Sequence, residues 1–197
     1  GDHEAAERAP ARARQCPRLS EMQDPWIDEL DDMTLIPKYL LVRADQLKRT
    51  EHYGRAEELL RKAIEIEPAN SESLQILAEM LLKRGQLEDA KPLIEKALEE
   101  SPKSRSVLTT YGRLMGRLGN LDKARAAFAE VVSMNPQSTN GLHGLGMVAY
   151  AEGNFADSSE YFEQAARQSE FRFDSAIDMY LASLSRLGQD EIAVRFL

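Results

Sequence analysis

Large and small apolar residues recur along the chain in columns that are 34 residues apart, with polar positions between them. Large side chains fill two columns, Leu40, Leu74, Leu108, Leu142 and Leu60, Ile94, Phe128, Phe162, and small ones fill two more, Ala44, Ala78, Gly112, Gly146 and Ala56, Ala90, Ala124, Ser158. Small residues let two helices cross closely, and large residues fill the space between them. Each period therefore predicts a pair of packed helices.

The breaks between the expected helices repeat at the same spacing. Pro68, Pro102 and Pro136 follow the second helix of successive periods, where a proline blocks further helical growth. Glycine is expected to end the first helix with a left-handed turn at Gly85, Gly119 and Gly153, whereas the first period has Glu51 at that place. The last junction departs from the pattern, because Glu170 replaces the proline and one extra residue follows it. We expect that junction to bend differently.

This order of small residues, turn glycine and terminal proline resembles the tetratricopeptide repeat family. The resemblance implies an all-α fold, a right-handed α-solenoid of tandem helix-turn-helix repeats. It also implies an interaction scaffold that binds a peptide or helix of a partner protein in a concave groove. The expected repeats are about 37–70, 71–104, 105–138 and 139–173, with a partial repeat at 174–197.

The residues before the first repeat divide into two parts. Residues 1–20 lack periodic large apolar side chains and are expected to be mobile. Residues 21–36 are expected to form a short capping helix with Trp26, Leu30 and Met33 on one face. That face would cover the end of the first repeat, because the ends of solenoids need closure. The alternative is an acidic, aromatic segment that docks on another protein.

Repeat spacing also predicts which side chains line the groove, since the first helices of successive repeats face it. They offer both polar and apolar contacts, which suits an extended peptide or a helix. The expected partner-binding residues are Lys38, Leu41, Asp45, Gln75, Glu79, Leu82, Lys83, Thr109, Arg113, Arg117, Asn140, His143, Met147 and Tyr150.

Basic residues recur near the ends of these first helices, at Arg49, Lys83, Arg117 and Arg186, with Lys48 beside them. One hypothesis is a basic edge that recognises an acidic or carboxylate-bearing peptide. The other is that each cation offsets the dipole at its own helix C-terminus. The two-carboxylate clamp by which some tetratricopeptide domains bind chaperone tails is not indicated, because Leu41 and Asp45 stand where it needs Lys and Asn.

Residues for catalysis or cofactor binding are not indicated. His3, His52 and His143 are scattered, and the single Cys16 has no second thiol to form a metal site. The glycine-rich run at 141–146 falls inside an expected helix, so it is not a nucleotide-binding loop. We therefore expect neither an enzyme nor a bound cofactor.

The composition limits the classes of partner that the protein can bind, but it does not indicate the cellular compartment. A net charge of −8 argues against general nucleic-acid binding, and the longest apolar runs are too short to span a membrane. Bacterial cytoplasm and periplasm both remain open. The chain starts without Met and ends with Ile192, Phe196 and Leu197 lacking a closing helix. We expect either a longer native chain or an end that docks on another subunit or protein.

Two glycines in the fourth repeat, Gly141 and Gly144, lie outside the packing columns. Glycine inside a helix costs roughly 0.5–1 kcal/mol relative to alanine. A Gly144→Ala substitution is therefore predicted to raise stability if that backbone is helical. A clear loss would instead indicate a close contact or a bend.

The function best supported by the sequence is a non-catalytic scaffold or adaptor for a protein or peptide. Its repeats look bacterial, which favours a role in complex assembly or secretion. The alternative is a regulatory region of a larger enzyme or of a multihaem cytochrome-like protein. A catalytic or haem-attachment motif next to this region in the gene would support that alternative, and a separate gene would support the adaptor.

Overall fold

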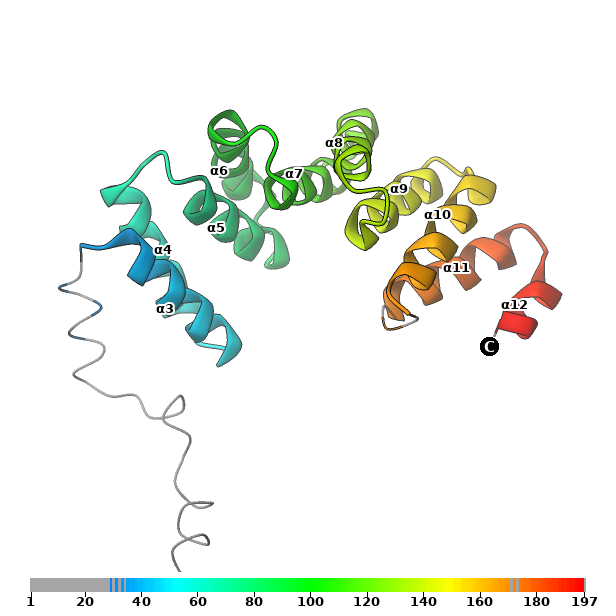
Figure 1. Cartoon of the computed structure of the whole chain (residues 1–197), viewed down its shortest axis with the longest axis horizontal. Coiled ribbons are helices and arrows are strands. Elements are labelled where there is room, and N and C mark those ends of the chain that lie inside the picture. Colours follow the sequence, from blue (N-terminus) through cyan, green and yellow to red (C-terminus); the bar gives the residue numbers. More distant parts are fainter. Residues whose placement is uncertain are drawn as a thin grey trace, which may run out of the picture. The chain divides into compact units, whose positions relative to one another are not determined.

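The computed structural model describes residues 35–170, 172 and 174–196, together with Glu29, Asp31 and Met33; for 194–196 it describes the backbone alone. All regular elements in this part of the chain are α-helices (Figure 1), so the prediction of an all-α fold is confirmed. The predicted mobile segment and Trp26 of the predicted capping helix lie outside the described residues.

The described residues form two compact units, which divide after Pro68. In the first unit, α3 (Pro37–Arg49) and α4 (Tyr53–Ile66) form one helical hairpin. The second unit continues the same arrangement in four further hairpins. Its helices are α5 (Ser71–Lys83), α6 (Leu87–Glu100), α7 (Arg105–Arg117), α8 (Leu121–Met134), α9 (Thr139–Ala151), α10 (Phe155–Gln168), α11 (Asp174–Arg186) and α12 (Asp190–Phe196).

Within the second unit the helices are stacked in sequence. The hairpins α5–α6, α7–α8 and α9–α10 pack tightly within themselves, whereas α11 and α12 make fewer contacts with each other. In addition, α8 packs on α9 and α10 packs on α11. The first helices of successive hairpins touch as well, because α7 contacts both α5 and α9. As a result α5, α7 and α9 form one continuous layer (Figure 1). The glycine-rich run at 141–146 lies inside α9, as expected.

The four predicted columns form the core of the hairpins. All of their members are buried, from Leu40 and Leu60 in the first unit to Leu142 and Phe162 in the second. The residues in the two columns of small side chains must be small for steric reasons, in addition to being buried. A β-carbon added at Gly112 or Gly146 would lie 2.9 Å from the ring of Phe128 or Phe162. These glycines therefore let two helices approach closely, as the pattern predicts.

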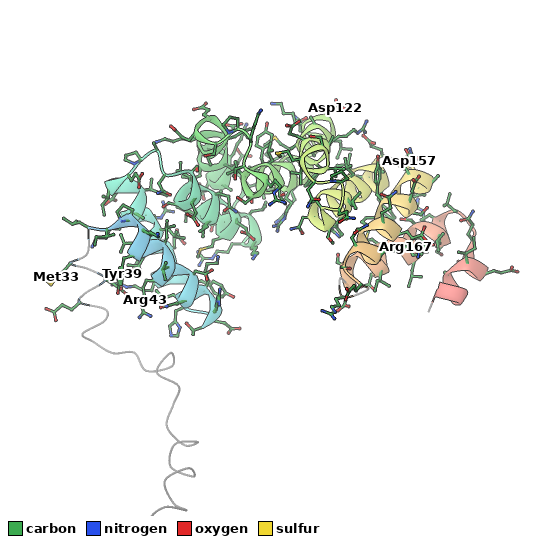
Figure 2. All side chains as sticks on the ribbon, in the orientation of Figure 1. Met33, Tyr39, Arg43, Asp122, Asp157 and Arg167 are labelled. Atoms are coloured by element: carbon green, nitrogen blue, oxygen red, sulfur yellow. The ribbon has the colours of Figure 1, made fainter. Side chains whose placement is uncertain are left out.

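The turns within the hairpins have the predicted left-handed conformation. The φ angles of Gly85, Gly119 and Gly153 are 82°, 78° and 80°. Glu51 occupies the same position in the first hairpin with φ 64°, a conformation that a residue with a β-carbon adopts at a cost. Next to the turns, Asp122 and Asp157 lie in the first turns of α8 and α10 (Figure 2), where a negative charge stabilises the helix dipole.

The junction between α10 and α11 differs from the others, as expected. It spans residues 169–173, whereas the junction between α8 and α9 spans 135–138, so the extra residue is confirmed. Glu170, at the expected proline position, has φ 52°. The preceding residue also differs, since Ser169 has φ −87° and ψ 7° where the equivalent Asn135 is extended.

The expected gain from Gly144→Ala is wrong, although the backbone of Gly144 is helical. An added β-carbon at this position would lie 2.3 Å from Cδ1 of Phe128, too close for any real contact. Gly141 has a similar role, because its β-carbon would lie 2.8 Å from Cγ2 of Val132. Both glycines allow α9 to lie directly against α8, and this steric requirement outweighs their lower helix propensity.

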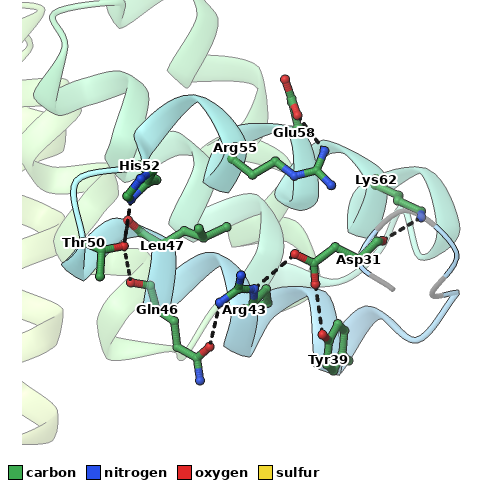
Figure 3. A network of polar contacts seen from close by, with 10 residues as sticks. All are labelled: Asp31, Tyr39, Arg43, Gln46, Leu47, Thr50, His52, Arg55, Glu58 and Lys62. Atoms are coloured by element: carbon green, nitrogen blue, oxygen red, sulfur yellow. Dashed lines mark hydrogen bonds and ion pairs between the residues drawn. The ribbon is translucent and has the colours of Figure 1, made fainter. Parts of the chain in front are cut away.

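A buried acid holds the segment that precedes α3 against the first hairpin (Figure 3). The side chain of Asp31 is fully buried. Its carboxylate accepts hydrogen bonds from the Tyr39 hydroxyl (3.0 Å) and from Nε of Arg43 (3.1 Å). The ammonium group of Lys62 donates to the Asp31 backbone oxygen at 3.0 Å. Burial, followed by the bond to Asp31, raises the pKa of Tyr39.

Sequence patterns did not indicate Asp31, and they assigned a covering role to Met33. The structure places Met33 in solvent with 72% of its surface exposed (Figure 2). The described contacts between this segment and the hairpin are therefore polar, made by Asp31.

Candidate functional site

Four helices of the second unit, α5, α7, α8 and α9, line a groove of about 900 Å³. The groove follows α7 along its length, from Arg105 at the first residue to Arg117 at the last. Of the residues that the sequence predicts at a binding surface, eight line this groove: Gln75, Glu79, Thr109, Arg113, Arg117, Asn140, His143 and Met147.

The other predicted residues lie elsewhere. Lys38, Leu41 and Asp45 belong to α3 in the first unit, and Leu82, Lys83 and Tyr150 lie in the second unit outside the groove lining. The prediction fails for two leucines because they are core residues: Leu41 is 7% exposed and Leu82 is 1% exposed. Tyr150 packs edge-on against the ring of Phe155, with the ring centroids 5.2 Å apart.

One side of the groove carries a polar network centred on Glu79. Its carboxylate is 3.2 Å from Nζ of Lys83 and 3.6 Å from Nη1 of Arg113. Gln75, which is buried, donates to Thr110 on α7 at 3.0 Å and to Glu79 at 3.4 Å. Glu79 therefore brings Arg113 toward α5 across the groove, while the Arg113 side chain stays 42% exposed.

His143 lies on α9 on the other side. Its Nε2 is 3.0 Å from the hydroxyl of Ser175, and its ring packs edge-on against Phe162 with the centroids 5.4 Å apart. Burial lowers the pKa of His143, and the positive charge of Arg113 lowers it further. The imidazole is thus favoured in its neutral form at neutral pH, in which it can donate or accept a hydrogen bond.

The members of the predicted basic row each have a partner within the chain. Arg49 pairs with Asp45 at 2.8 Å, and Lys83 pairs with Glu79. Arg117 donates to the backbone oxygen of Leu82 in the last turn of α5 at 2.6 Å. Arg186 lies 4.4 Å from the ring centroid of Phe155. These contacts favour the interpretation that the row stabilises helix ends.

Two kinds of lining residue escaped the sequence analysis. The floor contains Phe128, Leu121 and the glycines of α7 and α9, and it was missed because Phe128 was assigned to the core alone. Arg105 was also missed, although its position carries a signal. It is the first residue of α7, where the helix dipole disfavours a cation, so its charge does not serve helix stability.

The described residues contain no group of three or more His, Cys, Asp or Glu side chains that could hold a metal ion. Among the helices described here, none has the length and apolar character of a membrane span.

The repeated hairpins agree with a comparison of family models. The model described as Tetratricopeptide repeat matches residues 49–114 and 81–147, which together cover half of the chain. The chain belongs to the tetratricopeptide repeat family. Proteins of this family are generally non-catalytic interaction modules, and this chain is accordingly a protein-interaction scaffold for protein or peptide partners. No curated protein matches it.

Solved structures share the tetratricopeptide fold over most of the chain. PilW, described as a widely conserved type IV pilus biogenesis factor, is 20% identical with a TM-score of 0.76, covering 86% of this chain and 78% of PilW. YrrB, a TPR protein with an unusual peptide-binding site, is 17% identical with a TM-score of 0.63; the match covers 87% of this chain and 88% of YrrB. MamA from Desulfovibrio magneticus RS-1 is 15% identical, with a TM-score of 0.68 and coverages of 81% and 89%. At these identities the likeness establishes the fold alone.

Proposed function

We propose that the chain is a non-catalytic adaptor that holds a segment of a partner protein, as an extended peptide or a helix, in the groove along α7. The observation that carries this proposal is the convergence of Glu79, Arg113 and His143 from three different helices on one open groove. Exposed apolar surface accompanies them at Met147, which is 44% exposed. A surface with both kinds of contact suits a peptide partner.

The dimensions of the groove agree with a short segment. From Arg105 to Arg117 the axis of α7 rises by about 18 Å, taking 1.5 Å per residue. An extended peptide of about five or six residues covers that distance at roughly 3.3 Å per residue. A helix of about twelve residues has the same length, so the length of the groove is compatible with either conformation.

We further propose that the partner belongs to a bacterial assembly or secretion complex. Support comes from the likeness to PilW, a type IV pilus biogenesis factor. YrrB adds an example of the same fold with a peptide-binding site.

Site-specific photocrosslinking in the native cell tests the groove. A photoreactive phenylalanine analogue replaces Asn140, which is exposed and lines the groove, and in a matched variant it replaces Lys123, which is exposed on α8 outside the lining. We expect a discrete adduct with one protein at position 140 that is absent at position 123. Adducts at position 123 alone, or equal labelling at both, would move the binding surface away from the groove.

A further inference from the structure

The groove has an excess of positive charge within an acidic protein. Its described lining contains one carboxylate, Glu79, and three guanidinium groups, Arg105, Arg113 and Arg117. With His143 neutral, these groups leave a formal charge of +2, whereas the whole chain carries −8. Positive charge gathered in a concave site attracts negatively charged ligands even when the total charge is negative.

The three arginines differ in how far the protein already uses them. Arg117 is held by its bond to the Leu82 carbonyl. Arg113 makes a long ion pair with Glu79 at 3.6 Å, a carboxylate that Lys83 also approaches at 3.2 Å. Arg105 is exposed and makes no ion pair within the described part of the chain. Arg105 and Arg113 therefore have hydrogen-bond donors available for a ligand.

The charges lie beside an apolar strip. Leu121 from α8 and Met147 and Ala151 from α9 line the same groove, and Ala151 and Met147 are exposed. Gly144, which also lines the groove, lies directly against the ring of Phe128. A large apolar side chain of a ligand would remove this strip from water, at roughly 25 cal/mol per Å² of apolar surface.

We infer that the groove takes an acidic segment of a partner protein, with its carboxylates on Arg105 and Arg113 and one large apolar side chain on the strip of Leu121, Met147 and Ala151. This inference rests on the proposed function and adds the chemistry of the ligand. Arg105 supports it independently. A cation at the first residue of a helix opposes the dipole, and a carboxylate bound there would compensate the arginine and the helix N-terminus together.

Selection from a displayed library of random peptides tests the chemistry. The peptides have about twelve residues, longer than α7 when extended. They are selected on the full chain and kept only when an Asn140→Trp variant, which adds a bulky side chain to the groove lining, fails to bind them. We expect the retained peptides to share at least two acidic residues and one aromatic or long aliphatic residue. Their binding should weaken steeply with salt.

Affinity measurements then identify the arginines. Arg113→Gln and Arg105→Gln should each weaken a selected peptide by about tenfold, as expected for losing one charge-assisted hydrogen bond. Replacing the facing peptide Glu by Gln should give the same loss, with little further loss when both changes are combined. Arg167→Gln is the matched control, because Arg167 pairs with Glu163 on α10 outside the groove lining (Figure 2). It should change affinity by less than about twofold.

The outcomes separate this inference from the proposed function. Retained peptides that are neutral or basic, or that bind the Arg105 and Arg113 variants with unchanged affinity, would overturn the acidic ligand and leave a peptide-binding groove. If no peptide depends on the groove, both the inference and the proposed function fail. Circular dichroism of each variant establishes that its helices are intact.

Discussion

Replacing Gly144 by alanine is expected to destabilise the second unit, against the usual helix preference. In an open helix this substitution stabilises by roughly 0.5–1 kcal/mol. Here the new β-carbon would lie 2.3 Å from Cδ1 and 2.4 Å from Cε1 of Phe128. On the α7 side the ring already lies close to Gly112, where even an added β-carbon would be only 2.9 Å from it, so a shift toward α7 gives little relief. Phe128 is 3% exposed, so neighbouring residues enclose most of its ring.

The expected loss of stability follows from two opposing contributions, the clash with Phe128 and the gain in helix propensity. Overpacking a well-packed core costs about 1–3 kcal/mol. After the gain in helix propensity is subtracted, the net loss in the free energy of unfolding is centred on about 1 kcal/mol. For a chain of this size the melting temperature should fall by about 2–4 °C.

Thermal and urea unfolding followed by circular dichroism measure the effect. Gly116→Ala is the matched control, since Gly116 is also helical but its β-carbon would meet only Cβ of Ala124 at 3.9 Å. That control should be neutral or stabilising by up to about 1 kcal/mol. Phe128→Leu should recover part of the loss when combined with Gly144→Ala, since the two changes share one contact. A Gly144→Ala protein as stable as the wild type would refute the steric role of the ring.

Three further changes test other parts of the structure. Asp31→Asn should destabilise the first hairpin by about 1–3 kcal/mol, because Arg43 loses its buried counter-charge; hydrogen exchange of α3 measures this, and the exposed Asp45→Asn serves as control. Ser158→Ala should cost about 1 kcal/mol in urea unfolding, since its hydroxyl bonds the Gly146 carbonyl and Ser183, while Ser159→Ala on the exposed face of α10 should cost little. Because the pKa of His143 is lowered in the folded protein, the unfolded chain binds a proton at this residue more strongly. Neutral His143 therefore contributes stability that is fully present above the ordinary pKa of 6.5 and is lost as the pH falls through the folded pKa. His143→Gln should make the urea midpoint change less between pH 7.5 and pH 5.5.

The repeat columns made the helical hairpins predictable from sequence. A small residue such as Ala78 and a large one such as Ile94 recur because each hairpin solves the same packing problem as the one before it. The turn at Gly85 is predictable for the same reason, since a left-handed residue is needed wherever the hairpin reverses. Eight of the expected groove residues also face one groove, because helix geometry fixes which positions share a face.

Contacts that are specific to one place in the array were not predictable in this way. Phe128 meets Gly144 across two neighbouring hairpins, a pairing that no column within a repeat describes. Leu82 is buried in the core although Tyr150, which occupies the same column, is partly exposed, so spacing alone misplaced Leu82. Asp31 lies before the first repeat, where no periodicity guides the assignment. These three features depend on contacts between individual side chains in space, and the spacing of residues along the sequence does not predict such contacts.

The hydrogen bonds that Asp31 makes with the first hairpin also determine how this array of repeats could be shortened or joined to other repeats. A fragment starting at Pro37 would preserve every column of the first repeat, yet it would lack Asp31 and leave the guanidinium of Arg43 and the hydroxyl of Tyr39 without their acceptor. A consensus repeat joined upstream would place apolar side chains against these two donors, and each donor would lose its hydrogen bond without gaining water. A graft at this end therefore needs an acid at the position of Asp31, or apolar replacements for Tyr39 and Arg43 together.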